Sequence, residues 1–382
     1  MKLRKSLIKM VNQMPKARET VLEIDLKALK HNFQYLKSKL NSNTKILAVV
    51  KAFAYGSDAN EVANYLQSLK VDYFAVAYVS EGVALRDAGV ETPILVLHPQ
   101  AINFKTLIER CLEPSLYSAK IFNEFIAIAS EEKQSNYPVH IKFNTGLNRL
   151  GFSENDVDYI VSKAMETSAI KVKSIFSHLA ASEDLNEKTF TERQIKTFKS
   201  ISKEFSKAIG YQPMLHLANT SGVLNYPEAH LDMVRTGIGL YGFGNSKEEN
   251  KNLKPIATLK SVISQIHTIE KGETVGYNRA YKSEGVEKTA TIPIGHADGI
   301  GRQYGNKKGF VTVNGNKAPI IGNVCMDMIM IDITNINCHE GDEVIIFGNH
   351  PNASQFADAT NTITYEIITA ISQRVKRLLI KD

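Results

Sequence analysis

The chain has 382 residues, of which 43% are hydrophobic and 23% are charged, and its formal net charge is +6. This composition excludes a disordered chain and predicts a soluble protein with a large core and about two domains. The lysines and arginines are scattered over helix-like segments instead of gathering with aromatic residues into a stripe, which argues against a nucleic-acid partner.

The start of the chain and the cysteines show no sign of export. Residues 1–18 are basic, but polar residues interrupt their apolar patches, so they lack the core of a signal peptide and are predicted to form a basic arm. No later apolar run is long enough to span a bilayer. Cys111, Cys325 and Cys338 have no paired spacing, so neither disulfides nor a cysteine zinc site is expected. We predict a cytoplasmic protein without bound metal or a membrane partner.

From residue 19 onward, apolar runs rich in β-branched and aromatic residues alternate with helical patterns. The runs that predict strands are 46–50, 73–77, 94–97, 114–117, 139–143, 172–176, 214–217 and 231–234. Helical patterns between them include 59–69, 80–88, 119–131, 155–166, 187–208 and 220–225. Eight such alternations are typical of a (β/α)8 barrel, and a doubly wound open sheet is the competing fold. We predict an α/β protein in which residues 19–250 form a TIM barrel.

A second, mostly β domain is predicted over residues 251–382. Its expected strands are 256–267, 289–293, 310–313, 318–321, 328–333 and 344–347, all rich in Val, Ile and Thr. Asn314-Gly315 predicts a type I′ hairpin turn, because both turn residues must tolerate positive φ. Apolar residues at helical spacing predict a closing amphipathic helix over 365–379.

Polar residues directly follow several predicted strands, and these strand ends meet at the catalytic face of a barrel. Lys51 ends the first run, where partial burial can lower the pKa of a lysine as a Schiff-base lysine requires, although many lysines merely end a strand and reach water. The hydroxyls of Thr220 and Ser221 and the backbone around Gly237 and Gly239 suit an anion held by N–H groups. Such a pocket could serve an aldolase acting on a phosphosugar, or it could hold pyridoxal phosphate.

Seven motifs in order resemble the alanine racemase family, the fold type III pyridoxal-phosphate enzymes, from Leu22 to the C-terminus. They are EIDL with ALKHN (23–32), AVVKAFAYG (48–56), KFNTGLNRLG (142–151), SHLA (177–180), AN (218–219), VRTGIGLYG (234–242) and NVCMD (323–327). The resemblance implies that a first strand near Glu23 pairs with the C-terminal domain.

The resemblance implies an isomerase that interconverts L-alanine and D-alanine on a pyridoxal-phosphate aldimine and supplies D-alanine for bacterial peptidoglycan. It implies that Lys51 forms the aldimine and acts as one base, and that Tyr277 is the second base. Arg235 would face the pyridine nitrogen and, because a guanidinium keeps its protons, leave that nitrogen unprotonated. Lys142 matches a lysine that is carbamylated in many relatives and then orients Arg149. A homodimer with shared active sites is implied.

The resemblance also implies a supporting shell around the cofactor and the substrate. The implied cofactor-binding residues, besides Lys51, are Tyr55, Arg149, His178, Asn219, Thr220, Ser221, Arg235, Gly237, Ile238 and Tyr365. The implied substrate-binding residues are Arg149, His296, Met326 and Asp327. His178 is expected to link Tyr277 to Arg235.

Three positions depart from the family pattern. Phe53 and Ser57 replace its usual asparagine and histidine beside the cofactor lysine. His296 replaces a tyrosine that narrows the substrate entrance, so a broader racemase that also accepts serine is an alternative. A fold type III decarboxylase would need an acidic residue where Arg235 stands, and a non-enzymatic pyridoxal-phosphate carrier would resemble the barrel alone.

Overall fold

The computed structural model of the protein describes residues 17–381. The predicted basic arm therefore lies outside the described residues, apart from its last two positions. The chain divides into two compact units, of which one contains Asp25–Ile256 and the other contains Ala257–Leu379 with the described residues before Asp25. Within residues 17–381, no helix is both long and apolar enough to cross a membrane.

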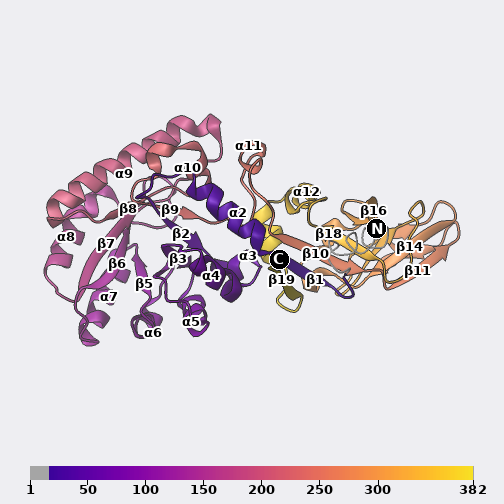
Figure 1. Cartoon of the computed structure of the whole chain (residues 1–382), viewed down its shortest axis with the longest axis horizontal. Helices are drawn as coiled ribbons and strands as arrows, with labels where there is room; N and C mark the ends of the chain where they lie inside the picture. The colour runs from indigo at the N-terminus through magenta and orange to yellow at the C-terminus, as the bar shows by residue number, and fades with distance from the viewer. Residues whose placement is uncertain (1–16, 382) are drawn as a thin grey trace, which may run out of the picture. The chain divides into compact units, whose positions relative to one another are not determined.

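The first unit is a closed barrel of parallel strands, which confirms the predicted (β/α)8 barrel and excludes the open sheet (Figure 1). Pairing of the first strand with the last, from Lys45 opposite Met233 to Ala48 opposite Thr236, closes the barrel. Its strands are β2 (Lys45–Val49), β3 (Tyr73–Val76), β4 (Ile94–Val96), β5 (Glu113–Leu116), β6 (Tyr137–Lys142), β7 (Ile170–Phe176), β8 (Met214–His216) and β9 (Met233–Thr236).

Helices surround the barrel strands, as Figure 1 shows. The α-helices are α2 (Leu26–Lys37), α3 (Lys51–Tyr55), α4 (Ala59–Ser68), α5 (Val79–Asp87), α6 (Phe104–Glu109), α7 (Ala119–Glu131), α8 (Val157–Met165), α9 (Lys188–Ile209), α10 (Thr220–Asn225) and α11 (Lys247–Asn250). Single 3₁₀ turns are η1 (Ala101–Asn103), η2 (Glu154–Asp156), η3 (Leu185–Glu187) and η4 (Pro227–Ala229). Local chemistry sets several of the helix ends: the Asp58 side chain caps α4, and Gly210 ends α9 with φ of +82°.

The last barrel strand begins two residues later than the sequence predicts. Leu231 adopts a left-handed backbone with φ of +53°, so it cannot continue a strand. The next residue, Asp232, accepts a hydrogen bond from the Leu215 backbone N–H through its side chain at 2.8 Å. The turn therefore extends to Asp232, and β9 starts at Met233.

The second unit is built on a nine-stranded sheet whose order is β11-β14-β17-β16-β15-β18-β10-β1-β19. Its strands are β1 (Val21–Asp25), β10 (Ala257–Val262), β11 (Gln265–Ile269), β14 (Glu287–Ile292), β15 (Phe310–Val313), β16 (Asn316–Ile321), β17 (Ile329–Asp332), β18 (Glu343–Phe347) and β19 (Lys376–Ile380). The two-stranded β12 (Thr274–Val275) and β13 (Tyr281–Lys282), the turns η5 (Tyr277–Arg279), η6 (His296–Asp298) and η7 (Arg302–Tyr304), and the helices α12 (Ala353–Asp358) and α13 (Thr364–Ala370) complete it.

Pairing in this sheet agrees with part of the sequence prediction. Asn314 and Gly315, with φ of +47° and +79°, form the two-residue turn between β15 and β16, which confirms the hairpin. The strand near Glu23 pairs antiparallel with β10, with Glu23 opposite Thr258. The predicted single run 256–267 is instead two strands, because β10 pairs with β18 whereas β11 pairs with β14.

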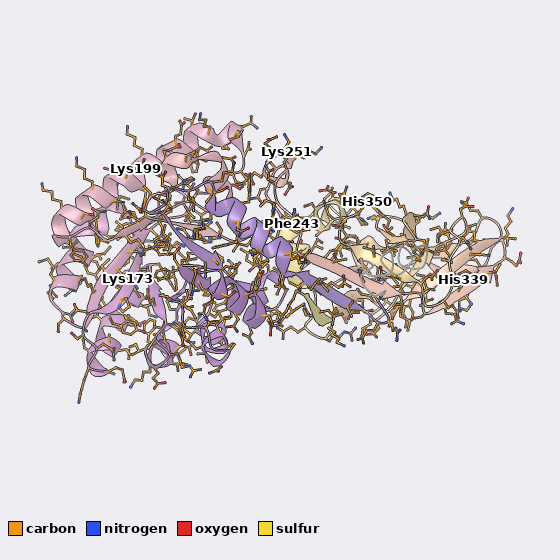
Figure 2. The ribbon with its side chains drawn as sticks, in the orientation of Figure 1. Lys173, Lys199, Phe243, Lys251, His339 and His350 are labelled. Atoms are coloured by element: carbon orange, nitrogen blue, oxygen red, sulfur yellow. The ribbon has the colours of Figure 1, made fainter. Side chains whose placement is uncertain are left out.

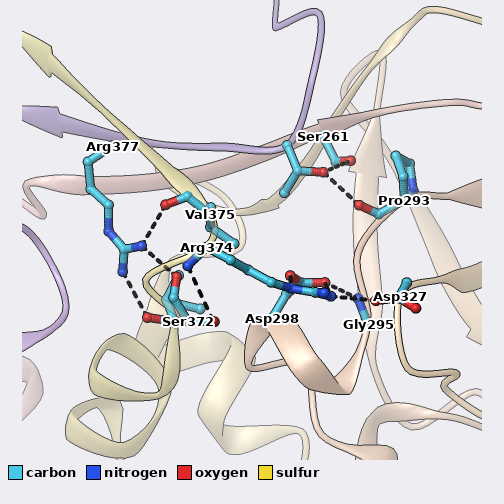
Figure 3. Close-up of polar contacts among 11 residues, drawn as sticks. Ser261, Pro293, Gly295, Asp298, Asp327, Ser372, Arg374, Val375 and Arg377 are labelled. Atoms are coloured by element: carbon cyan, nitrogen blue, oxygen red, sulfur yellow. Dashed lines mark hydrogen bonds and ion pairs between the residues drawn. The ribbon is translucent and has the colours of Figure 1, made fainter.

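The predicted closing helix over 365–379 is wrong in its second half. The α-helix α13 stops at Ala370, where Ile371 turns to an extended backbone, and residues from Lys376 form β19 beside β1. The Arg377 guanidinium donates to the carbonyl groups of Ile371, Ser372 and Val375 (Figure 3). These bonds satisfy carbonyls that a longer helix would have used, and the sheet edge at β1 gains a strand.

Candidate active site

The segment after β2 has an unusual left-handed backbone. Residues 52–55 all have φ between +51° and +57°, and Gly56 follows with φ of +81°. A left-handed turn of non-glycine residues costs roughly 1–2 kcal/mol per residue, so surrounding contacts must hold it. One such contact comes from α5, where the Glu81 carboxylate accepts the Ala52 backbone N–H at 2.6 Å. The turn thereby holds Lys51 at the carboxyl end of its strand.

Lys51 lies half-buried in a positively charged environment. Burial lowers the pKa of Lys51, the charge of Arg149 lowers it further, and Glu81 opposes both effects. A lysine in this setting releases its proton more readily than a lysine in water, as a Schiff-base lysine or a general base must.

A close-packed cradle lies where the ends of β2 and β9 meet. The Thr220 hydroxyl lies 3.3 Å from the backbone N–H nitrogens of both Gly237 and Gly239. An added Cβ on Gly237 would lie 2.4 Å from the Tyr55 hydroxyl oxygen, so only glycine allows this approach. The Tyr55 ring in turn stacks on Tyr241, with ring centroids 4.4 Å apart. Two hydroxyls and a glycine backbone thus converge, as a phosphate group requires.

Two other residues predicted to bind the cofactor make structural contacts. The Asn219 side chain accepts the Gly222 backbone N–H at 2.8 Å and so caps α10. The Ser221 hydroxyl donates to the buried Glu249 carboxylate at 3.0 Å and lies 2.9 Å from the Asn245 side-chain amide. Of the two adjacent hydroxyls, Thr220 is therefore the one placed against the glycines. Ile238 is buried between those two glycines.

Arg235 on β9 is buried and is fixed by several acceptors. Its Nη2 atom donates to the carbonyl groups of Ser177 at 2.6 Å and Leu217 at 3.0 Å and lies 3.0 Å from His178 Nδ1. Its Nη1 atom lies 3.1 Å from His216 Nδ1. Because arginine has only donors, Nδ1 of His178 and Nδ1 of His216 are acceptors, and one of the two Nη2 hydrogens is shared between acceptors. The proton of a neutral His178 is then on Nε2 and faces another group. Burial lowers the pKa of Arg235 to about 9, so the group stays charged at neutral pH.

Three cations surround His178 and Lys51. Burial lowers the pKa of Lys142 to about 8, and the charges of Arg149, Arg235 and Lys51 act in the same direction. Burial and then the charge of Arg235 lower the pKa of His178 well below its ordinary value. Lys142 makes no ion pair with the described carboxylates, and its Nζ lies 6.0 Å from the centroid of the Phe176 ring. The barrel end is therefore strongly positive, which suits a phosphorylated and carboxylated ligand.

The second unit brings together other predicted residues. Tyr277 begins η5 and is 71% exposed, and its carbonyl accepts the Asn323 side-chain amide at 3.0 Å. The turn that carries His296 is joined to the same loop, because the His296 backbone N–H donates to the Cys325 carbonyl at 2.9 Å. Met326 is exposed beside it, and the Ala297 backbone N–H donates to its carbonyl.

Asp327 is held by an arginine that the sequence analysis missed. Arg374 Nη2 donates to Asp327 at 2.6 Å, and Arg374 also binds the Asp298 carboxylate through Nε at 2.6 Å and Nη2 at 3.1 Å (Figure 3). Tyr365 lies on α13 of the same unit and is half-exposed. Arg374 fell within the predicted closing helix, so its sequence position carried no signal of this role.

A barrel that presents a lysine of lowered pKa, a glycine and hydroxyl cradle and a buried arginine at its strand ends fits a cofactor that has both an aldehyde and a phosphate. These features define the class of barrel enzymes that use pyridoxal phosphate.

Comparisons with known proteins identify the family. The alanine racemase N-terminal domain family matches residues 24–244, and the alanine racemase C-terminal domain family matches residues 256–379. The chain is 35% identical to alanine racemase 2 of Oceanobacillus iheyensis over 375 residues, 96% of this chain and 94% of that protein. The chain therefore belongs to the alanine racemase family, and its reaction is the pyridoxal-phosphate-dependent interconversion of the two enantiomers of alanine.

Solved structures agree over both domains. The alanine racemase of Clostridium difficile 630 superposes with a TM-score of 0.90 at 33% identity, covering 95% of this chain and 96% of the other. The alanine racemase of Bartonella henselae, solved with covalently bound pyridoxal phosphate, gives a TM-score of 0.86 at 28% identity over 95% of this chain and 100% of the other.

Proposed function

We propose that Lys51 and Tyr277 are the two bases of the racemase, one for each face of the substrate's α-carbon. The observation that carries this proposal is Lys51 itself: a half-buried amine of lowered pKa, held by a left-handed turn beside the glycine and hydroxyl cradle. The neutral amine can take a proton from carbon on one side, and a tyrosine on the other side can return one.

The barrel residues would hold the cofactor in this proposal. Tyr55, Thr220 and the backbone from Gly237 to Gly239 would bind the phosphate, and Lys51 would hold the cofactor covalently. When bound, the cofactor supplies an electron-withdrawing ring that stabilises the carbanion formed at the α-carbon. Asn219, placed as the cap of α10, would position Thr220.

Arg235 would face the ring nitrogen of the cofactor. Its fixed contacts use only Nη1 and Nη2 among the described residues, so Nε–H is available for this partner. The guanidinium keeps its protons at neutral pH and can therefore donate a hydrogen bond without protonating the ring nitrogen. Limited electron withdrawal favours rapid return of the proton, as racemisation needs. His178, with its Nε2–H pointing away from Arg235, would connect Arg235 to Tyr277.

Lys142 would be carbamylated and would orient Arg149 toward the cofactor and the substrate carboxylate. Its lowered pKa of about 8 leaves a usable fraction of neutral amine, which can add carbon dioxide and release one proton. The product is an anion among several cations, so it would relieve their repulsion. Carbon-13 NMR of protein equilibrated with labelled bicarbonate should show one carbamate signal that a Lys142→Arg variant lacks, and its absence in the unmodified protein would exclude the modification.

The active site would be shared in a homodimer, in which Tyr277 and His296 of one chain, with Met326 and Asp327 beside them, meet the barrel of the other. The exposure of Tyr277 within its own unit supports this arrangement, because contact with a partner subunit would bury this side chain. The D-alanine formed would supply peptidoglycan in a bacterial cytoplasm, which growth of a D-alanine-requiring strain carrying the gene would test.

Borohydride reduction followed by peptide mass mapping tests the proposed function. The protein incubated with pyridoxal phosphate should become labelled at Lys51, and a Lys51→Ala variant should not. Lys142→Arg serves as the control because it removes the other buried amine of the cluster and should leave the Lys51 label in place. A label at Lys142, or no label at all, would overturn the assignment.

A further inference from the structure

Five neighbouring barrel strands each contribute one polar side chain to a continuous hydrogen-bonded chain through the barrel core. Arg235 on β9 contacts His216 on β8 at 3.1 Å, and His216 Nε2 lies 2.8 Å from the Ser174 hydroxyl on β7. Ser174 lies 2.5 Å from His140 Nδ1 on β6. His140 Nε2 lies 2.6 Å from the Glu113 carboxylate on β5. All five side chains are buried.

When both histidines are neutral, the two ends of this hydrogen-bonded chain determine the direction of every bond. Arg235 can only donate, so His216 Nδ1 accepts and His216 Nε2–H donates to Ser174. The Ser174 hydroxyl accepts that hydrogen bond and donates its own proton to His140 Nδ1. His140 therefore carries its proton on Nε2 and donates it to Glu113, whose carboxylate can only accept. Burial followed by the charge of Arg235 lowers the pKa of His216 well below its ordinary value, which favours a neutral ring there.

The carboxylate end is stabilised where β7 carries an extra residue. The register between β6 and β7 shifts after Val139, so that Val172 and Ser174 pair with successive residues of β6 and Lys173 is the extra residue. Lys173 Nζ lies 2.8 Å from Oε1, the second carboxylate oxygen of Glu113. The Lys173 side chain, which is labelled in Figure 2, is 38% exposed. Burial works to raise the pKa of Glu113, but the hydrogen bond from His140 and then the hydrogen bond and charge of Lys173 oppose it, and the pKa is lowered. Glu113 therefore stays ionised.

We propose that Glu113, His140, Ser174 and His216 are positioning residues of the racemase that couple an ionised carboxylate at one end of the barrel core to Arg235 at the other. Each bond polarises the next, so the negative charge of Glu113 makes His216 a stronger acceptor for Arg235. A stronger acceptor holds the guanidinium in place and keeps it charged in a buried position. The inference rests on the proposed role of Arg235 beside the cofactor ring.

Ser174 is the link at which the chain can be cut with little change in volume. Ser174→Ala removes the hydroxyl that joins the two histidines, and Ser174→Thr retains a hydroxyl at the same carbon. Ser115→Ala is a matched control, because Ser115 is an equally buried serine on β5 whose hydroxyl has no partner among the described residues. Its loss therefore breaks no bond of the chain.

The first measurement is nitrogen-15 NMR of the histidine rings in the holoenzyme, assigned with His140→Gln and His216→Gln. We expect both rings to be neutral with the proton on Nε2. This readout does not depend on activity or on the assignment of Lys51. A positively charged ring at His140 or His216, or a proton on Nδ1 of either ring, would overturn the directed chain.

The second measurement records, for each variant, the visible absorption band of the bound cofactor and the steady-state kinetics. Loss of a hydrogen bond in a buried chain predicts a fall in kcat of about tenfold for Ser174→Ala, with KM changed less than about twofold and a shifted band. Ser174→Thr should restore both, and Ser115→Ala should change neither. Glu113→Gln, at the far end of the chain, should shift the band in the same direction as Ser174→Ala.

The outcomes separate this inference from the proposed function. Nε2 protons on both histidines, together with an unchanged band and kcat in Ser174→Ala and Glu113→Gln, would overturn the coupling while leaving a Lys51 label intact. A missing Lys51 label would instead overturn the proposed function. If Ser174→Ala does not fold, Glu113→Gln decides, because a normal band and kcat in that variant also contradict the coupling.

Discussion

Two lysines, one in each unit, are almost equally buried but lie in opposite electrostatic environments. Lys142 in the barrel is 8% exposed, and among residues 17–381 the charges that act on its amine are cations, with the Phe176 ring 6.0 Å away. Lys260 on β10 is 7% exposed and lies 3.0 Å from Glu23 and 3.4 Å from Glu343. The β unit neutralises its buried charge, whereas the barrel leaves its own uncompensated. Uncompensated buried charge costs stability, and this one lies at the strand ends, where the proposed site is.

The largest effect should come from the two proposed bases, Lys51 at the cationic barrel end and Tyr277 on an exposed turn of the β unit. Lys51→Ala and Tyr277→Phe should each lower kcat by about 10³-fold or more, because each removes one proton acceptor. Mixing the two inactive variants and allowing subunit exchange should restore roughly a quarter of the unmodified activity. About half of the dimers would be mixed, and each mixed dimer would hold one intact site.

Subunit exchange must be verified with differently tagged chains. No recovery despite verified exchange would place both bases in the same chain and would contradict the shared site.

The two buried lysines should respond to removal with opposite signs. The difference between the ordinary pKa of 10.5 and about 8 for Lys142 corresponds to about 3 kcal/mol of unfavourable free energy at neutral pH. Lys142→Met should therefore stabilise carbamate-free apoprotein by up to about 3 kcal/mol. Lys260→Met should destabilise it by about 3 kcal/mol, because the buried Glu23 and the half-buried Glu343 both lose the cation that pairs with them. Denaturant unfolding at pH 7 measures both.

The pH dependence of the stability change caused by Lys142→Met tests whether the lost charge is its cause. The folded pKa of Lys142 is below the unfolded value, so the unfolded chain binds more protons between about pH 8 and 10.5. The penalty is complete below pH 8 and disappears as pH rises through that window. The gain in stability from Lys142→Met should shrink accordingly, and a gain that is constant with pH would show that lost charge is not its cause.

Arg235→Glu tests the proposal that this buried cation faces the cofactor ring. A carboxyl group can hold a proton at the ring nitrogen, which a guanidinium withholds, so kcat should fall by about 100-fold and a new long-wavelength absorbance should appear with alanine present. Lys199→Glu makes the same change of charge on an exposed face of α9, so it should change neither quantity (Figure 2). Unchanged spectra with Arg235→Glu would contradict the proposal that Arg235 faces the cofactor ring.

The smallest effect concerns the left-handed turn after β2. Ala52→Gly should stabilise the protein by about 1 kcal/mol, because glycine adopts φ of +52° without the Cβ clash. Ala84→Gly, at an exposed position inside α5, should destabilise it by about 1 kcal/mol. Thermal unfolding of both variants provides the comparison, and equal losses of stability would mean that the turn stores no strain at Ala52.

Much of the architecture followed from local sequence pattern. The alternation of apolar runs with helical spacing predicted the barrel, and Asn314-Gly315 predicted the hairpin of β15 and β16 in the second unit. Both signals are readable because residue spacing and tolerance of positive φ are properties of short segments. The motifs around Lys51, Arg149 and Arg235 predicted the family and the cofactor. These signals depend on neighbours in sequence, so no tertiary contact was needed to see them.

Tertiary contacts decided the rest. Residues 376–380 became a strand because β1 offers an edge, although their spacing suggests a helix. His140 and His216 lie within apolar runs that carry no signal of a shared network, yet barrel closure aligns them with Ser174 and Arg235. A hydrogen bond between side chains 34 or 42 residues apart depends on register between strands, and register is set only when the whole barrel closes.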